Sequence, residues 1–184
     1  MADAAGPVRQ QLEFLLNGFS FYARREQVRA DDLLVRGRAA AALGRAGSAL
    51  RDLASRYRRR FLPDPTRDDP TPPTGAMQGL RAIEGLHQDV GDAEARLRGQ
   101  GFPASDRTWA RLRSEHVALE LALAFDRRLI AEADEVEERC RALRPEDLGG
   151  EPGIEPAGLV PARQSLDALL RTLRERTAHL SIPD

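Results

Sequence analysis

Apolar residues recur every three or four positions along most of the chain, which is the spacing of one face of an α-helix. The pattern predicts four long helices, near residues 31–61, 76–98, 105–143 and 161–182. No segment has the alternating pattern of a half-buried strand. We therefore predict an all-α protein, an antiparallel bundle of about four long helices.

The N-terminal part of the chain predicts a shorter, aromatic-rich helical segment that begins at Pro7. Phe14, Phe19, Phe21 and Tyr22 are four of the eight Phe and Tyr residues of the chain. We interpret this group as a hydrophobic lid or as an oligomer contact. The next helix is expected to begin at Asp31 and Asp32, because Asp is favoured as an N-cap and in the first helical turn.

Two segments interrupt the helical pattern. Residues 62–75 contain five prolines, which remove backbone donors and fix φ, so this segment predicts an exposed connector. Residues 145–160 are rich in Pro and Gly and predict a second loop. We expect residues 1–184 to form a single helical-bundle domain joined by these two connections.

The charges are unevenly distributed along the chain. All 28 basic residues are arginine, and the net charge is −1. Residues 1–61 hold 12 Arg and 6 acidic residues, whereas the remainder holds 16 Arg and 23 acidic residues. Such polarity is typical of a molecule that pairs its own halves or pairs with copies of itself.

A stripe of small residues lies in the first half of the helix predicted over residues 31–61. Its members are Gly37, Ala40, Ala41, Gly44 and Gly47. Each glycine costs about 1 kcal/mol relative to alanine inside a helix. We therefore expect the stripe to permit a close approach of another backbone.

The composition also limits location and covalent chemistry. The start of the chain has no positive region followed by an apolar one, and no segment reaches the length of a membrane span. Cys140 is the single cysteine, so the chain has no disulfide, and we read this residue as a small core residue. We expect a soluble, cytoplasmic protein that does not enter a membrane.

The three histidines are the main candidates for metal chemistry. His87, His116 and His179 fall on three different predicted helices, and imidazole is a ligand for Zn²⁺ or Ni²⁺. Glu84 precedes His87 at a spacing that places both on one helical face. We interpret these histidines as ordinary bundle residues and expect no metal and no cofactor, with the metal-dependent bundle enzyme kept as the alternative.

Four arginines lie close together at the end of the second predicted helix. Arg56, Arg58, Arg59 and Arg60 are placed where the helix dipole favours cations. Beside Tyr57 and Phe61 they could also contact phosphate, which makes a small subunit of a nucleoprotein complex a second alternative.

The function that the sequence favours is a non-enzymatic helical-bundle protein that binds another protein or itself, as an oligomer or as a subunit of a larger complex. No nucleophile, phosphate loop or convergent acid–base pair stands out in the chain. The residues expected at the interface are Phe19, Phe21, Tyr22, Tyr57 and Phe61.

Overall fold

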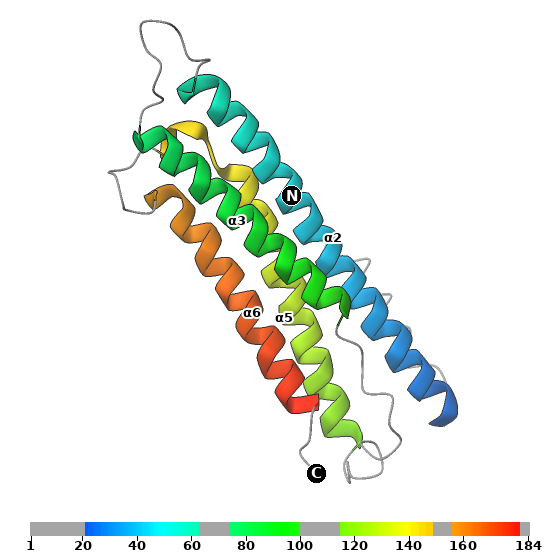
Figure 1. The fold of residues 1–184 in the computed structure, drawn as a ribbon. Helices are drawn as coiled ribbons and strands as arrows, with labels where there is room; N and C mark the ends of the chain where they lie inside the picture. Colours follow the sequence, from blue (N-terminus) through cyan, green and yellow to red (C-terminus); the bar gives the residue numbers. More distant parts are fainter. Residues whose placement is uncertain (1–20, 63–73, 100–114, 149–155, 181–184) are drawn as a thin grey trace, which may run out of the picture.

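The computed structural model describes residues 21–62, 74–99, 115–148 and 156–180. Four α-helices make up most of this part and pack together (Figure 1). They are α2 (Phe21–Phe61), α3 (Thr74–Gly99), α5 (Glu115–Ala142) and α6 (Val160–Leu180). No strand occurs in these ranges, so the all-α prediction is confirmed for the described part of the chain.

Helix α2 is one continuous helix of 41 residues. The sequence predicted a short N-terminal segment and a separate helix that begins at Asp31, and this division is wrong. No glycine or proline occurs between Phe21 and Gly37, so nothing in the backbone ends the helix there. Asp32 is an interior helical residue with a buried side chain, not an N-cap. Residues 1–20, which include Phe14 and Phe19, lie outside the described ranges.

The two connections differ from their predictions. The connector predicted over 62–75 is shorter, because α3 begins at Thr74, and residues 63–73 are not described. The loop predicted over 145–160 contains two 3₁₀ helices, η1 (Pro145–Leu148) and η2 (Ala157–Leu159). Leu148 and Leu159 are fully buried, so this connection contributes to the core.

The order of contacts along the helices gives their relative directions. Arg36 of α2 bonds to the Leu97 carbonyl of α3, whereas Tyr57 lies next to Gly79, so α2 and α3 run in opposite directions. Arg38 and Arg45 of α2 pair with Asp134 and Glu137 of α5, so α2 and α5 run in the same direction (Figure 1). An antiparallel arrangement is therefore not confirmed for the bundle as a whole.

The core consists mainly of leucine and alanine from all four helices. The predicted α2 seam is confirmed, since its five residues are at most 3% exposed: Leu43, Ala46, Leu50, Leu53 and Tyr57. Leu86 and Val90 of α3, Leu129 and Val136 of α5, and Leu169 of α6 pack into the same core. Burial of each such side chain stabilises the fold by about 1.5–3 kcal/mol before the entropic cost.

Among the described helical glycines the tightest contact is at Gly79, not along the glycine stripe of α2. A Cβ added at Gly79 would overlap the Tyr57 hydroxyl and lie 2.7 Å from Cζ of the same ring. At Gly44 and Gly47 the nearest atoms belong to the Glu94 and His87 side chains. The expected approach of another backbone at these two glycines is therefore wrong within the described structure.

Candidate functional site

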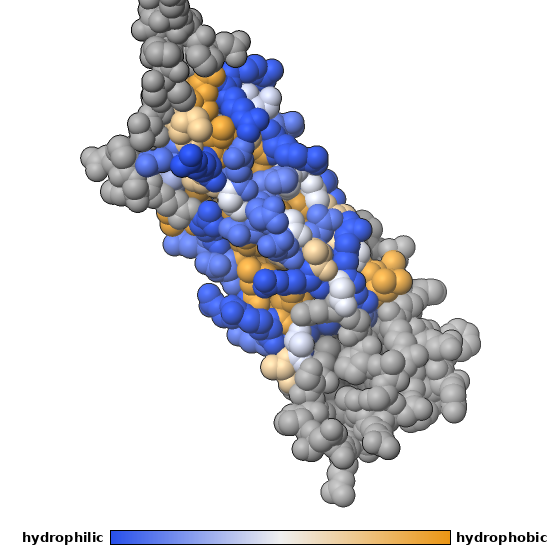
Figure 2. Space-filling view, in the orientation of Figure 1, coloured by the Kyte–Doolittle hydropathy of each residue, from blue (hydrophilic) through white to orange (hydrophobic). Residues whose placement is uncertain are grey.

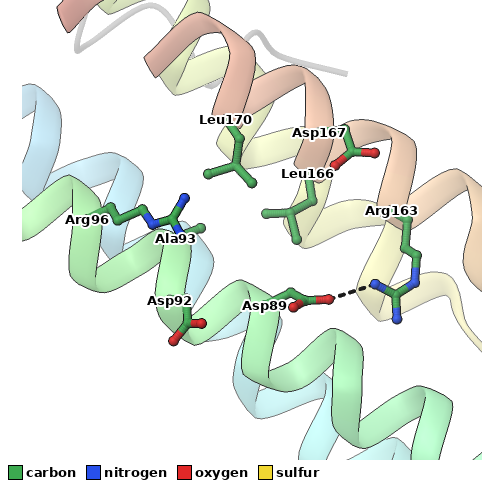
Figure 3. A pocket seen from close by; sticks show the side chains of 8 residues that line it. All are labelled: Asp89, Asp92, Ala93, Arg96, Arg163, Leu166, Asp167 and Leu170. Carbon is green, nitrogen blue, oxygen red and sulfur yellow. Dashed lines mark hydrogen bonds and ion pairs between the residues drawn. The ribbon is translucent and has the colours of Figure 1, made fainter. Parts of the chain in front are cut away.

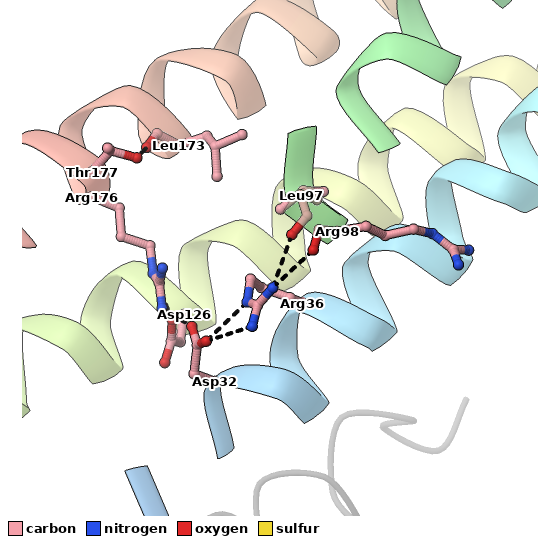
Figure 4. A network of polar contacts seen from close by, with 8 residues as sticks. All are labelled: Asp32, Arg36, Leu97, Arg98, Asp126, Leu173, Arg176 and Thr177. Atoms are coloured by element: carbon pink, nitrogen blue, oxygen red, sulfur yellow. Dashed lines mark hydrogen bonds and ion pairs between the residues drawn. The ribbon is translucent and has the colours of Figure 1, made fainter. Parts of the chain in front are cut away.

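A buried ion cluster joins all four helices near one end of the bundle (Figure 4). Its members are Asp32 and Arg36 of α2, Asp126 of α5 and Arg176 of α6. The side chains of Asp32 and Arg176 are each 3% exposed. Two arginines and two carboxylates balance in charge, as buried ions require.

Each charged group of this cluster has a defined contact. Asp32 accepts hydrogen bonds from Arg36 Nε at 2.9 Å and from Arg176. Arg176 Nε donates to Asp126 at 3.1 Å. Arg36 also donates to the carbonyls of Leu97 and Arg98, at 3.4 and 3.2 Å. It thereby satisfies carbonyls in the last turn of α3 that have no helical partner.

The buried ion cluster positions the helices and offers no reactive group. Each charged side chain in it is paired with another member of the cluster. The sequence indicated one pair of this cluster, because Asp32 and Arg36 are four residues apart on one helical face. Arg176 and Asp126 could not have been connected to this pair from local sequence.

Five of the eight arginines of α2 whose side chains are described form ion pairs within the fold. Arg38 pairs with Asp134 of α5 at 3.4 Å, and Arg45 pairs with Glu137 at 2.6 Å. Arg58 and Arg60 of α2 pair with acidic residues of α3 and η1. The opposite charges of the two halves of the chain therefore serve packing between its own helices, one of the two readings that the sequence left open.

The structure divides the four clustered arginines into two pairs. Arg58 binds Glu84 of α3, and Arg60 binds Glu146 of η1. Arg56 and Arg59 lie on a different side of α2, along its contact with α5. The sequence treated these arginines as one group because helical neighbours were considered without their partners on other helices.

Two of the predicted interface residues, Tyr57 and Phe61, pack against the core. Tyr57 is 3% exposed, and its ring lies 4.9 Å from that of the half-buried Phe61. Burial raises the pKa of the Tyr57 hydroxyl. Tyr57 and Phe61 thus pack against each other near the end of α2. Phe19 lies outside the described residues, as do the side chains of Phe21 and Tyr22.

The exposed apolar residues of α2 are elsewhere on the helix. Leu33 and Leu34 are 63% and 62% exposed. Gly37 and Ala41 follow on the same exposed side, and a Cβ added at Gly37 would meet no described atom within 4 Å. Two of the five residues of the predicted small-residue stripe thus lie on an uncovered surface that continues from the two leucines.

A shallow cleft of about 250 Å³ lies between α3 and α6 (Figure 3). Ala93, Leu166 and Leu170 line its apolar part, and Arg163 pairs with Asp89 across it at 2.6 Å. Figure 2 shows this face as mostly hydrophilic, with apolar surface between the two helices. The ion pair between Arg163 and Asp89 thus connects the two sides of the cleft.

The histidines of the metal-dependent alternative lie at different levels along the helices that carry them. His87 lies ten residues before Leu97, which is roughly 15 Å along α3 from the level of the buried ion cluster. His179 lies past that level in the opposite direction, and His116 lies farther still. Glu84, the fourth candidate ligand, is paired with Arg58.

Metal and thiol chemistry find no further support in the described residues. No group of three His, Cys, Asp or Glu side chains in those ranges could hold a metal ion. The side chains of His116 and His179 are not among them. Cys140 is 2% exposed, and burial raises the pKa of its thiol to about 12, which keeps the thiol protonated at neutral pH.

No helix in the described ranges is both long enough and apolar enough to cross a membrane. Comparison of the chain with protein-family models, with curated proteins and with solved structures finds no match.

Proposed function

We propose that this protein is a non-enzymatic helical bundle that works through protein–protein contact, and that its first partner is a second copy of itself. The contact surface is the exposed side of α2 formed by Leu33, Leu34, Gly37 and Ala41. The observation that carries the proposal is the exposure of the two leucines, 63% and 62%, directly beside the bare backbone of Gly37.

The geometry of this surface suits another helix. Leu33, Gly37 and Ala41 are spaced four residues apart, so they form one line along α2. Small residues in such a line allow a second backbone to approach closely, while the leucines supply apolar area. A second copy offers the same line of residues, which permits a symmetric contact.

A bulky polar residue at Gly37 tests the contact without disturbing the single chain. Gly37→Gln removes a helix-destabilising glycine, and its Cβ meets no described atom within 4 Å, so we expect the isolated protein to stay folded. We expect the wild-type chain to increase in mass with concentration in sedimentation experiments. The Gly37→Gln variant should require a concentration about tenfold higher or more, a loss of roughly 1.4 kcal/mol.

Gly91→Gln on α3 is the matched control, because Gly91 is also exposed and has no described atom near its added Cβ. It should associate like the wild type. Replacing both Leu33 and Leu34 with Ser should weaken association by about 2 kcal/mol or more if they are anchors. A wild-type protein that remains monomeric at every concentration would contradict the proposal.

A further inference from the structure

A groove of about 690 Å³ runs along the contact between α2 and α5, on a part of the surface separate from Leu33 and Leu34. Four arginines line it, three from α2 and one from α5. They are Arg45, Arg56, Arg59 and Arg141.

Two of these arginines are held in place by one buried carboxylate. Arg45 donates from Nε to Glu137 at 2.8 Å and from a terminal nitrogen at 2.6 Å, and Arg141 lies 3.0 Å from the same carboxylate. The Glu137 side chain is 10% exposed, whereas those of Arg45 and Arg141 are 49% and 64% exposed. The carboxylate thus fixes both guanidinium groups from behind and leaves their outer sides facing the groove.

Both partners of this bidentate pair carry their charge at neutral pH. The hydrogen bond from Arg45 lowers the pKa of Glu137, against the opposing effect of burial. The same bond raises the pKa of Arg45. The cationic lining therefore persists throughout the physiological pH range.

The other two arginines are not neutralised by an ion pair. No described residue forms a hydrogen bond or ion pair with Arg56 or Arg59, although Arg58 and Arg60 in the same turns bind Glu84 and Glu146. Glu84 of α3 and Glu146 of η1 thus neutralise the arginines on one side of the C-terminal end of α2. The arginines on the groove side keep their donors available for a ligand.

The charge balance of the groove suits a phosphate group. Four arginines face two carboxylates, Glu137 behind them and Asp52 in the lining, which leaves two positive charges in formal excess. A phosphate group carries about −1.5 to −2 charges near neutral pH, and its oxygens match the planar fork of arginine. The Ser55 hydroxyl adds a further donor to the lining.

We infer that the groove between α2 and α5 binds the phosphate groups of a small phosphorylated ligand, held by Arg56 and Arg59 of α2 together with the prepositioned Arg45 and Arg141. No aromatic ring is among the described residues that line the groove, so the lining has no platform for stacking a base. Recognition is accordingly directed at the phosphate groups and not at an attached base.

Inorganic pyrophosphate is the probe for this site, titrated calorimetrically into the full chain at constant ionic strength. We expect saturable binding at one site per chain. The Arg56→Gln/Arg59→Gln variant should bind about tenfold more weakly or worse, which corresponds to about 1.4 kcal/mol. Arg141→Gln tests the α5 side of the groove independently and should also weaken binding.

The matched control is Arg58→Gln/Arg60→Gln. It removes the same two charges from the same helical turns, but at residues that bind Glu84 and Glu146. Its affinity for pyrophosphate should stay within about threefold of the wild type, apart from long-range electrostatics. Pyrophosphate should raise the melting temperature of the wild type and the control by mass action, with little effect on the groove variant.

Two results would overturn the assignment. One is the absence of saturable pyrophosphate binding to the wild-type chain. The other is an equal loss in the groove and control variants, which would show that the anion responds only to total positive charge. Neither result bears on self-association, because that experiment alters Gly37 and the leucines at a different place on α2.

Discussion

Arg176 and Asp32 form an ion pair in the interior of the bundle, although 144 residues separate them in the chain. They belong to α6 and α2, which lie diagonally opposite each other, since each packs against α3 and α5. Both side chains are 3% exposed, so water does not screen the interaction. The pair therefore connects two helices that share little other contact.

Removing one charge from this pair should strongly destabilise the fold. Asp32→Asn keeps the size of the side chain but leaves Arg36 and Arg176 with only Asp126 as a charged partner in the cluster. Breaking a buried pair in this way typically costs about 3–5 kcal/mol. Urea unfolding monitored by circular dichroism should show that loss.

Asp134→Asn is the control for this measurement, because Asp134 pairs with Arg38 on the surface, where the two side chains are 44% and 40% exposed. It should cost less than about 1 kcal/mol. If Asp32→Asn were equally mild, the buried ion cluster would not be stabilising the packing of the four helices.

The contact between Gly79 and Tyr57 predicts a steric effect of a single methyl group. Gly79→Ala would place a Cβ 2.7 Å from Cζ of the Tyr57 ring, and the ring is packed in the core. Overpacking of this kind costs about 1–3 kcal/mol, which exceeds the gain in helix propensity.

Gly91→Ala should have the opposite effect on the free energy of unfolding. No described atom lies within 4 Å of its added Cβ, so Gly91→Ala should stabilise α3 by up to about 1 kcal/mol. Melting temperatures of the two variants would give the comparison. If both variants shifted the melting temperature equally and in the same direction, the Tyr57 ring of α2 would not lie this close to Gly79 of α3.

The pair between Arg45 and Glu137 makes part of the stability depend on pH. The pKa of Glu137 is lowered in the folded protein, chiefly by the hydrogen bond from Arg45. Its contribution is therefore complete above the ordinary Glu pKa of about 4.3 and is lost as the pH falls through the lower folded value. Glu137→Gln should reduce stability at pH 7 by about 1–2 kcal/mol.

The difference between wild type and Glu137→Gln should shrink as the pH is lowered through that range. Glu135→Gln is the control, because Glu135 is 49% exposed and lies 3.4 Å from Arg139 on the surface. The stabilities of the wild type, Glu137→Gln and Glu135→Gln can be compared through their urea unfolding midpoints, measured from pH 7 downward. A difference that stays constant down to strongly acidic pH would contradict the assigned ion pair.

Helix content and core faces could be predicted from the sequence because both depend on residues close in the chain. The spacing of Leu43, Leu50 and Leu53 identified the buried side of α2, and the burial of all three confirms it. The same local reasoning failed at Asp32. An aspartate that follows polar residues resembles a helix cap, and only its partner on α6 explains its position inside the helix.

The candidate sites were less predictable, because they depend on which helices become neighbours. The sequence located the arginines near residue 58 but could not separate Arg56 and Arg59 from Arg58 and Arg60. That separation is produced by Glu84 and Glu146, which come from other elements. Similarly, Tyr57 was expected at an interface, and the approach of Gly79 places it in the core.

The sequence by itself determined that the described chain is helical and which side of each helix is apolar, since a period of 3.6 residues is set by local geometry. The tertiary structure decided that α2 lies beside α5 in the same direction, that Arg176 reaches Asp32, and that Glu137 aligns Arg45 and Arg141. These contacts join residues that are far apart in the chain. They depend on how the helices rotate and slide when their apolar sides pack, which no local pattern specifies.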